Sequence, residues 1–380
     1  MSGHPHNISS SYLDSSHLFR NQFNSERDSR RCFEHLGDIM APIPKNMRAI
    51  VCATPGPSSV LQIQNQPVPS PKPGEVLIQV LGFGINRAEM FTRQGHSPGI
   101  EFPRVIGIEC IGRVAAYGPP LAATKPKKFI IGQRVATCMG GLGREIPGSY
   151  QEYTCAVEEN LRAIPDTKNL SVGQIAALPE MFQTTWGALT EGLDVQQGES
   201  VLVRGATSSI GLCALQFLKV KLGAGRLGAT TRNAEREGML KDAGADEVFV
   251  DDGSIAGQFA KSKLGKFDKC LELVGTTTIL DSAACLNAKG TVCMTGIQGG
   301  QWELRNFNPM AIPNRVRLCG YGGGPSDFHA MPWEELVRDV DEGRISIPVE
   351  EYKMEDIKKI HDIMEKGGGG AKMAVVVANH

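Results

Sequence analysis

The sequence lacks three features that mark large classes of proteins: paired cysteines, long apolar runs and an excess of charge of one sign. Its ten cysteines form no Cys-x-x-Cys pair and share no repeated spacing, which favours buried free thiols in a reducing compartment over a disulfide framework. No uninterrupted apolar stretch is long enough to cross a bilayer. Lys and Arg number 40 against 41 Asp and Glu, so no electrostatic footprint for nucleic acid or an anionic membrane is present.

The composition is that of an ordinary globular protein. Hydrophobic residues make up 41% and charged residues 21% of the 380-residue chain. A chain of this length is long enough for two domains, each with its own core. We therefore expect a soluble cytoplasmic protein with at least two domains.

The first 46 residues differ from the rest of the chain. They are rich in Ser, Asn, His and Arg and lack hydrophobic periodicity, so residues 1–46 are predicted to be a disordered extension. Arginines among serines raise the alternative of a mitochondrial address. Acidic residues are interspersed with them, whereas transit peptides are poor in acids, so the mitochondrial alternative is less favoured.

Residues 47–170 form the second region and have a β-like texture. Short runs rich in β-forming residues, such as 48–53 and 75–82, are separated by Pro and Gly clusters. Similar runs continue to residue 157. This spacing predicts an all-β, barrel-like unit.

From residue 171 helical and strand-like segments alternate. A helical region at 172–193 precedes a strand at 201–203, a turn of small residues and a helix at about 210–222, and the alternation continues to residue 322. Regular alternation predicts a doubly wound parallel sheet with helices on both faces. Residues 323–380, with a short strand expected near 345–348, are predicted to return to the barrel-like domain.

The turn after the strand at 201–203 has the composition of a dinucleotide-binding loop. A pyrophosphate must approach backbone N–H groups at the positive end of a helix dipole, which requires small residues between strand and helix. Gly205 permits the tight turn and Gly211 permits close packing of the helix, although Thr207 replaces the middle glycine of the usual pattern. The predicted pyrophosphate-binding residues are Gly205, Ala206, Thr207, Ser208, Ser209, Ile210 and Gly211.

The end of the next strand indicates which nucleotide binds. An NAD site places an acidic residue about twenty residues past the loop, where it accepts a hydrogen bond from the ribose hydroxyl. This chain has Thr230, Thr231 and Arg232 there. Hydroxyls and a guanidinium suit a 2′-phosphate, so NADPH is the expected cofactor. The alternative is that Arg232 is only a solvated surface residue.

Taken together, these segments resemble the quinone oxidoreductase branch of the medium-chain dehydrogenase/reductase superfamily. The resemblance extends from residue 47 to about residue 377. It implies an α/β fold, namely a GroES-like β-barrel catalytic domain and a doubly wound Rossmann domain with the cofactor in the cleft between them. Apart from the loop at 205–211, its strongest marks are at residues 84–89, 107–109, 148–153, 177–180 and 184–186.

The same comparison argues against a metal. Zinc-dependent alcohol dehydrogenases of this superfamily have Cys where this chain has Asn86 and His where it has Ile108, and no His or Cys near residues 182–184 offers a third ligand. Glu89 and Glu109 alone make a poor zinc site without softer partners. We therefore expect no metal and predict a zinc-independent enzyme.

Without a metal, a conjugated acceptor is the more suitable substrate, because conjugation itself spreads the charge left after hydride transfer. The resemblance implies that Asn86 lines the substrate site, that Thr184 lies near the nicotinamide, and that Gln298 lies close to the cofactor. Some related enzymes carry tyrosines where this chain has Phe91 and Ser97. Their absence argues against a quinone as the physiological acceptor and leaves a more apolar pocket, suited to an enal, an enone or an enoyl chain. No residue stands out as a general acid, so protonation from solvent is expected.

Alternative functions remain open at this point. One is an enoyl or alkenal reductase, including one that acts in trans on a carrier-bound polyketide chain. Another is a non-catalytic NADPH-binding protein. The resemblance also implies a homodimer that pairs through an edge strand at residues 316–321.

Overall fold

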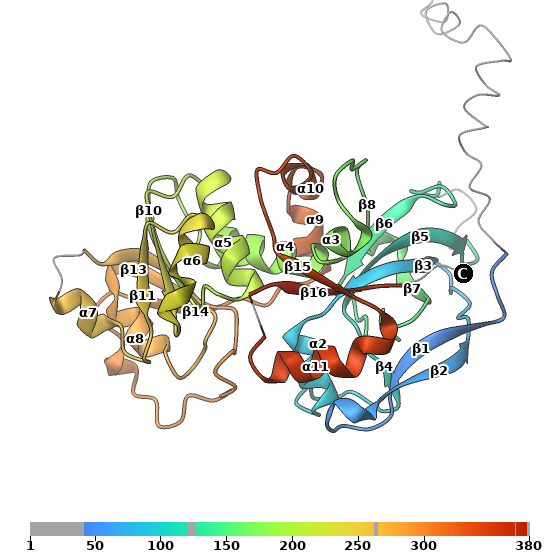
Figure 1. Cartoon of the computed structure of the whole chain (residues 1–380), viewed down its shortest axis with the longest axis horizontal. Helices are drawn as coiled ribbons and strands as arrows, with labels where there is room; N and C mark the ends of the chain where they lie inside the picture. Colours follow the sequence, from blue (N-terminus) through green and yellow to red (C-terminus); the bar gives the residue numbers. More distant parts are fainter. Residues whose placement is uncertain (1–41, 121–125, 262–264, 369, 378–380) are drawn as a thin grey trace, which may run out of the picture. The chain divides into compact units, whose positions relative to one another are not determined.

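The computed structural model describes residues 42–120, 126–261, 265–368 and 370–377 (Figure 1). The extension expected at residues 1–46 lies almost entirely outside the described residues. Within them the chain forms a six-stranded, a seven-stranded and a three-stranded sheet. No helix in the described part of the chain is long and apolar enough to cross a membrane.

The six-stranded sheet is entirely parallel and has the order β11-β10-β9-β12-β13-β14. Its strands are β9 (Ser200–Arg204), β10 (Arg226–Thr231), β11 (Glu247–Val250), β12 (Phe267–Glu272), β13 (Leu286–Met294) and β14 (Arg317–Gly320). The order runs outward in both directions from the β9/β12 pair. In sheets of this kind ligands bind beyond the carboxyl ends of the strands at that switch point.

Alternate side chains of β9 enter different cores, because successive residues of a strand face opposite sides of the sheet. Val201 and Val203 pack into the core shared with helix α5 (Ser209–Val220). Leu202 packs on the other side, in the core shared with helix α8 (Ile279–Ala284). Both faces are thus covered by helices, which confirms the predicted doubly wound sheet (Figure 1).

The other two sheets form the barrel-like part of the chain. The seven-stranded sheet has the order β15-β16-β3-β5-β6-β8, with β7 also pairing with β3, and the three-stranded sheet has the order β2-β1-β4. Strand β16, near the end of the chain, therefore lies beside β3 from its first half, and β15 pairs with β16 at the edge. The strands are β1 (Asn46–Cys52), β2 (Leu61–Pro67), β3 (Glu75–Gly84), β4 (Arg104–Val105), β5 (Glu109–Tyr117), β6 (Arg134–Cys138), β7 (Tyr153–Val157), β8 (Leu161–Ala163), β15 (Val349–Tyr352) and β16 (Lys372–Val376).

The strand expected near residues 345–348 was placed too early, because β15 begins at Val349. Ile345 and Ile347 alternate as in a strand and are buried, but they pack into the core without joining a sheet. The helical region expected at 172–193 is confirmed as α3, α4 and the π-helix η4 (Ala188–Gly192). Helix α3 spans Val172–Ala176 and α4 spans Pro179–Gly187. Further α-helices in the described residues are α2 (Arg87–Arg93), α6 (Glu237–Asp242), α7 (Ala256–Lys261), α9 (Pro325–Ala330), α10 (Trp333–Asp341) and α11 (Ile357–Glu365).

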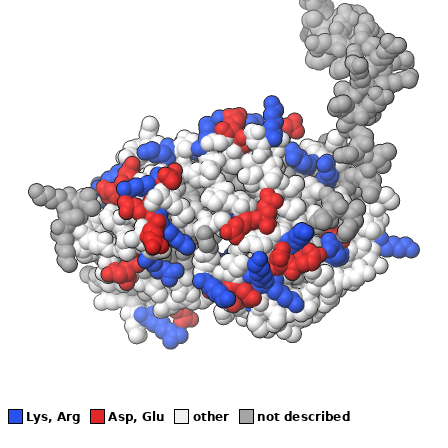
Figure 2. Space-filling model, in the orientation of Figure 1, with Lys and Arg blue, Asp and Glu red and all other residues white. Residues whose placement is uncertain are grey.

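Cysteines and surface charges agree with the composition. The nine cysteines within the described residues are all free, as predicted, whereas Cys32 lies outside them. On the face shown in Figure 2, basic and acidic side chains are interspersed.

Candidate functional site

The loop from Gly205 to Ser208 joins the carboxyl end of β9 to the start of α5, at the switch point of the parallel sheet. Gly205 has a φ of 80°, in the left-handed region that favours glycine. Its N–H donates to the Thr230 hydroxyl at 3.1 Å, which ties the loop to the end of β10. The predicted turn is therefore formed by the predicted residues.

The helix start leaves backbone donors exposed to a ligand. The Ser208 hydroxyl caps α5 by accepting from the Gly211 N–H at 3.1 Å, and it donates to the Gly205 carbonyl at 2.9 Å. The N–H groups of Ser209 and Ile210 have no acceptor within the described part of the chain. A Cβ on Gly211 would lie 2.6 Å from the backbone of Ala206, so a side chain there would displace the loop. These features fit a pyrophosphate bound at the α5 N-terminus, with Ser208 serving as the cap.

The residues expected at the adenosine end gather at the end of β10. The Thr231 hydroxyl donates to the Asn233 carbonyl at 3.0 Å and accepts from the Asn233 N–H, so it shapes the turn that carries Arg232. Thr230 is buried and donates to Asp251 at 3.3 Å. Of the three groups expected to face a 2′-phosphate, the Arg232 guanidinium is the one that has no hydrogen bond or ion pair within the part of the chain that the structure describes.

A second guanidinium, that of Arg87, lies within electrostatic range of Arg232. Arg87, the first residue of α2, comes from the barrel-like part of the chain and is half-buried. Burial, and then the positive charge of Arg232, lower the pKa of the Arg87 side chain. Neither guanidinium has a hydrogen bond or a carboxylate partner within the described residues. Two neighbouring cations without an acid form a strong candidate site for a phosphate group.

A buried ionic network holds the end of β9, directly before the loop, in place. Arg204, the last residue of β9, is fully buried and donates two hydrogen bonds of 2.8 Å to Asp251, which follows β11. It also donates to Asp281 of α8 at 2.6 Å and to Ser282 at 3.1 Å. Because Asp251 also accepts from Thr230, the network connects three strand ends at the base of the candidate nucleotide site.

Asn86 and Thr184, the two residues predicted to lie near the reacting groups, belong to one buried cluster. Asn86 precedes α2 and donates through Nδ2 to Glu109 of β5 at 2.9 Å. Thr184 of α4 donates to Glu180, one turn earlier, at 2.9 Å. Glu109 in turn accepts from the Glu180 backbone N–H at 2.7 Å. The structure thus brings Asn86 and Thr184 together through these two carboxylates.

Lys372, at the start of β16, completes this cluster. Its ammonium contacts Asn86 Oδ1 and lies 3.1 Å from Glu109 Oε1 and 3.5 Å from Glu180 Oε2. The Lys372 side chain is 3% exposed, and Glu109 is fully buried. One ammonium is therefore surrounded by three oxygen atoms.

Glu89 lies behind Asn86 and accepts from the Asn86 and Ile108 backbone N–H groups at 2.9 and 3.1 Å. Burial raises the pKa of Glu89 to about 7, although the hydrogen bond from Ile108 opposes the shift. Burial likewise raises the pKa of Glu180, against the opposing charge of Lys372. The cluster therefore contains more acidic groups than it can hold ionised.

The raised pKa of Glu89 predicts a pH-dependent stability. Between pH 4.5, its ordinary pKa, and about pH 7, the folded state keeps a proton that the unfolded state has lost. The free energy of unfolding should therefore fall as the pH rises through this window, by about 3 kcal/mol in total.

The measurement is urea unfolding at about pH 5 and about pH 8 of the wild type and of Glu89→Gln, whose side chain has no charge. Glu89→Gln should lose most of this pH dependence. Glu237→Gln, an exposed residue on α6, serves as the matched control and should behave as the wild type. If the free energy of unfolding changed equally with pH in all three proteins, Glu89 would not be the source of the pH dependence.

A surface cavity of about 550 Å³ lies beside the segment that follows α2, and Asn86, Thr184 and Lys372 are not among the residues that line it. His96 and Ser97 line it from one side, and Trp302 lines it from the loop after β13. The rings of Phe91 and Trp302 are 4.8 Å apart, edge to face, and those of Phe91 and His96 are 6.2 Å apart. Phe91 and Ser97, the positions considered in the sequence as pocket residues, thus lie at the same cavity, Ser97 in its lining and Phe91 against Trp302.

Gln298 lies beside the glycine loop, as expected for a residue close to the cofactor. Its Nε2 would be 3.3 Å from a Cβ on Gly205, and its N–H donates to the Leu273 carbonyl at 3.1 Å after β12. The contact places the loop 295–300 next to the carboxyl end of β9.

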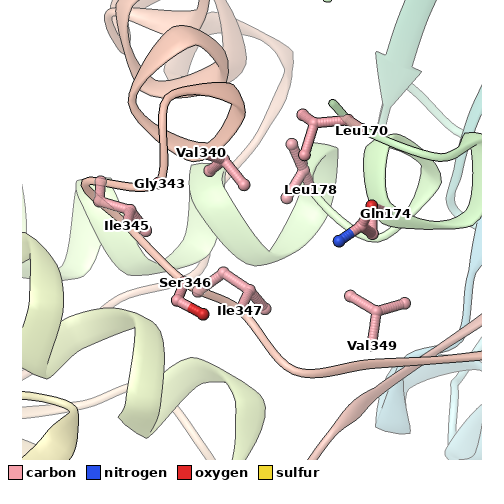
Figure 3. A pocket seen from close by; sticks show the side chains of 9 residues that line it. All are labelled: Leu170, Gln174, Leu178, Val340, Gly343, Ile345, Ser346, Ile347 and Val349. Carbon is pink, nitrogen blue, oxygen red and sulfur yellow. The ribbon is translucent and has the colours of Figure 1, made fainter. Parts of the chain in front are cut away.

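A smaller cavity, of about 180 Å³, lies under residues 345–349 (Figure 3). Its lining is mainly aliphatic, including Leu178, Ile345 and Ile347. Gln174 and Ser346 are the polar residues of its lining, and the Gln174 side chain is already engaged, because it accepts from the Ser171 N–H at 2.9 Å. None of the predicted site residues lines this cavity.

Four residues at the site were not singled out from the sequence. Arg87 and Glu180 lie inside segments that carried the family resemblance, so their positions were visible but their roles were not. Arg204 precedes the glycine loop directly, where a charged residue at the end of a buried strand is itself a signal. Lys372 has no local signal, because its partner Asn86 is 286 residues away.

Comparison with known proteins identifies the two domains of the chain. Residues 72–166 match the alcohol dehydrogenase GroES-like domain, and residues 209–339 match the zinc-binding dehydrogenase domain. The human quinone oxidoreductase is 30% identical over 264 residues, which cover 68% of this chain and 76% of that protein. A 2-methylene-furan-3-one reductase of Solanum lycopersicum is 32% identical over 302 residues, which cover 75% of this chain and 74% of that protein.

Solved structures show the same fold. A mycobacterial protein complexed with NADPH superposes with a TM-score of 0.75 at 26% identity, covering 87% of this chain and 99% of that one. The predicted combination of a GroES-like domain and a Rossmann domain is therefore confirmed. The chain belongs to the quinone oxidoreductase branch of the medium-chain dehydrogenase/reductase superfamily.

Proposed function

We propose that the protein is an NADPH-dependent reductase that passes a hydride to a quinone or another conjugated carbonyl compound without a metal ion. One observation carries the choice of nucleotide. Arg232 lies at the strand end where an NAD site carries a carboxylate, its positive charge is felt by Arg87, and neither guanidinium has an acidic partner in the described chain. A phosphate between them relieves their mutual repulsion.

The cofactor is held by the residues of the loop and of the β10 end. The N–H groups of Ser209 and Ile210 receive the pyrophosphate, and Gly205 and Gly211 leave room for it. Gln298 lies against the same loop. Once bound, the reduced nicotinamide supplies the hydride. The protein's own task is to orient the two reactants and to exclude water between them.

The site does not fit zinc. A catalytic zinc takes three N, S or O ligands and keeps one open position. Here Asn86, Glu109 and Glu180 turn their oxygen atoms toward the Lys372 ammonium, and that positive charge stands where a metal ion would have to stand. Ile108 offers no donor side chain. The proposed reaction therefore contains no metal-dependent step.

The proposed acceptor site is the cavity near Phe91, His96 and Trp302. The Trp302 ring in its lining, which packs against Phe91, offers an aromatic surface to a flat conjugated molecule. Conjugation spreads the negative charge that hydride transfer leaves, so a dedicated oxyanion donor is not required. Because the cavity is open to solvent, water supplies the proton.

An enone or enal reductase is the second candidate. Two features favour it: the tyrosine-free pocket around Phe91 and Ser97, and the similarity to a reductase named for a 2-methylene-furan-3-one. The substrate is then an enone or enal in place of a quinone, and the hydride goes to the β-carbon of its conjugated system. The two candidates share the cofactor and differ in the preferred acceptor.

Calorimetry and turnover test the proposed function. The chelator-treated protein is expected to bind NADPH more tightly than NADH and to oxidise NADPH with at least one member of a panel of quinones, enones and enals. NADPH binding without oxidation by any panel member would favour the non-catalytic alternative. No binding of NADPH would overturn the proposal.

We also propose a homodimer. Strand β14, at one edge of the six-stranded sheet, leaves its outer hydrogen-bonding groups open for a second copy within residues 316–321. Light scattering is expected to give twice the mass of one chain. A chain that remains monomeric at micromolar concentration would reject this pairing.

A further inference from the structure

Lys372 has a complete set of partners inside the protein. An ammonium has three protons, and three acceptors surround this one: Asn86 Oδ1, Glu109 Oε1 and Glu180 Oε2. Burial alone lowers the pKa of Lys372, but the surrounding carboxylates outweigh burial and raise it. The lysine therefore keeps its charge and is a poor proton donor.

The ammonium controls how Asn86 is oriented. Since Oδ1 of Asn86 contacts Lys372, its Nδ2 is turned to Glu109 at 2.9 Å and to Glu89 at 3.3 Å. Both ends of the amide are thus committed within the cluster. Asn86 lines the site with a fixed orientation that depends on the cation.

The ammonium also controls Thr184. Glu180 carries Lys372 on one oxygen and the Thr184 hydroxyl on the other, at 3.5 and 2.9 Å. Glu180 and Thr184 are partly exposed, whereas Lys372 and Glu109 are buried. A change at the buried cation therefore reaches the exposed hydroxyl through a single carboxylate.

We propose that the Lys372 ammonium is a permanent internal cation at this site, and that it positions the Thr184 hydroxyl through Glu180. The lysine is thus a positioning residue and not the proton donor. The positioning part rests on the proposed function, because Thr184 matters only if the nicotinamide lies beside it. The cation part concerns the free protein and does not depend on turnover.

The cation part is tested with Mn²⁺ as the probe. Lys372→Ala leaves an empty space bordered by carboxylate and amide oxygens, which are the ligands that hard divalent cations prefer. Mn²⁺ is expected to raise the melting temperature of Lys372→Ala and, in calorimetry, to bind it with one ion per chain. The wild type and Lys219→Ala, which removes an exposed lysine, should bind none. If Lys372→Ala requires Mn²⁺ in order to fold, refolding should succeed only with the ion present. Failure of Mn²⁺ to bind or to rescue Lys372→Ala overturns the internal-cation role.

The positioning part is tested with a charge-balanced variant. Lys372→Met combined with Glu109→Gln removes one charge of each sign and so avoids an unpaired buried charge. This double variant is expected to fold and to bind NADPH with a KM within about threefold of wild type, but to show a kcat about a hundredfold lower, because misplaced groups near reacting atoms cost about that much. Wild-type kcat in the double variant would overturn the positioning role.

Loss of the proposed function and loss of the positioning role give different results. If the wild type fails to oxidise NADPH with every acceptor of the panel, the proposed function fails. The Mn²⁺ measurement then still decides whether Lys372 is an internal cation. If the wild type turns over and the double variant is equally fast, the function stands and the positioning role is rejected.

Discussion

Arg232→Ala is expected to lower the preference for NADPH over NADH by about a hundredfold, because a charge-assisted hydrogen bond to phosphate contributes about 1.5–3 kcal/mol. The loss should fall on NADPH alone, since NADH carries a ribose hydroxyl where NADPH carries the dianionic phosphate. Dissociation constants for both nucleotides, measured by calorimetry at one fixed salt concentration, check this.

The neighbouring arginine provides an internal test. If Arg87 and Arg232 bind one phosphate, their effects should not be additive, and the double variant should lose less than the sum of the single variants in units of free energy. Arg305→Ala, which removes an exposed arginine paired with Glu303, is the matched control and should leave both constants unchanged. An unaltered NADPH preference in Arg232→Ala would show that Arg232 is only a surface residue.

Arg204→Met is expected to lower the free energy of unfolding by about 3–5 kcal/mol, because it leaves buried carboxylates without their counter-charge. Burial by itself raises the pKa of Asp251, but the hydrogen bonds and charge of Arg204 hold that pKa below its ordinary value. Methionine fills a similar volume, so the loss reflects charge more than packing. Urea unfolding measures it as a shift in midpoint.

Two further variants separate charge from packing in this network. Adding Asp251→Asn and Asp281→Asn to Arg204→Met should restore part of the stability, since the two carboxylates that paired with Arg204 are then uncharged. Lys241→Met breaks an exposed pair with Glu237 and should cost less than about 1 kcal/mol. If Arg204→Met costs no more than Lys241→Met, the buried network does not support the loop in the way described.

Local patterns predicted those parts of the fold and site that depend on neighbouring residues. The doubly wound sheet follows from helix and strand segments that alternate at regular intervals, and the loop at 205–211 follows from small residues between a buried strand and a helix. The end of β10 was found by counting from that loop. At residues 345–348 the same reasoning failed, because an alternating pattern shows burial and does not show whether a pairing partner is present.

Interactions between distant residues could not be predicted in this way. The Asn86 to Lys372 contact and the neighbouring guanidiniums of Arg87 and Arg232 depend on how separate parts of the chain come together. The Ser208 and Thr231 hydroxyls show the converse. Their chemistry suits a phosphate, yet the structure engages both in local hydrogen bonds, and contact with the cofactor stays a prediction for them.

The most direct test of the central claim is transfer of deuterium from NADPH labelled at the nicotinamide C4 to a conjugated enone, with metal-stripped protein and a chelator present. The label at the transferring face should appear on the β-carbon of the product, one atom per turnover, as seen by mass spectrometry. An unlabelled product, or labelling that begins only when zinc is added, would contradict hydride transfer from NADPH without a metal.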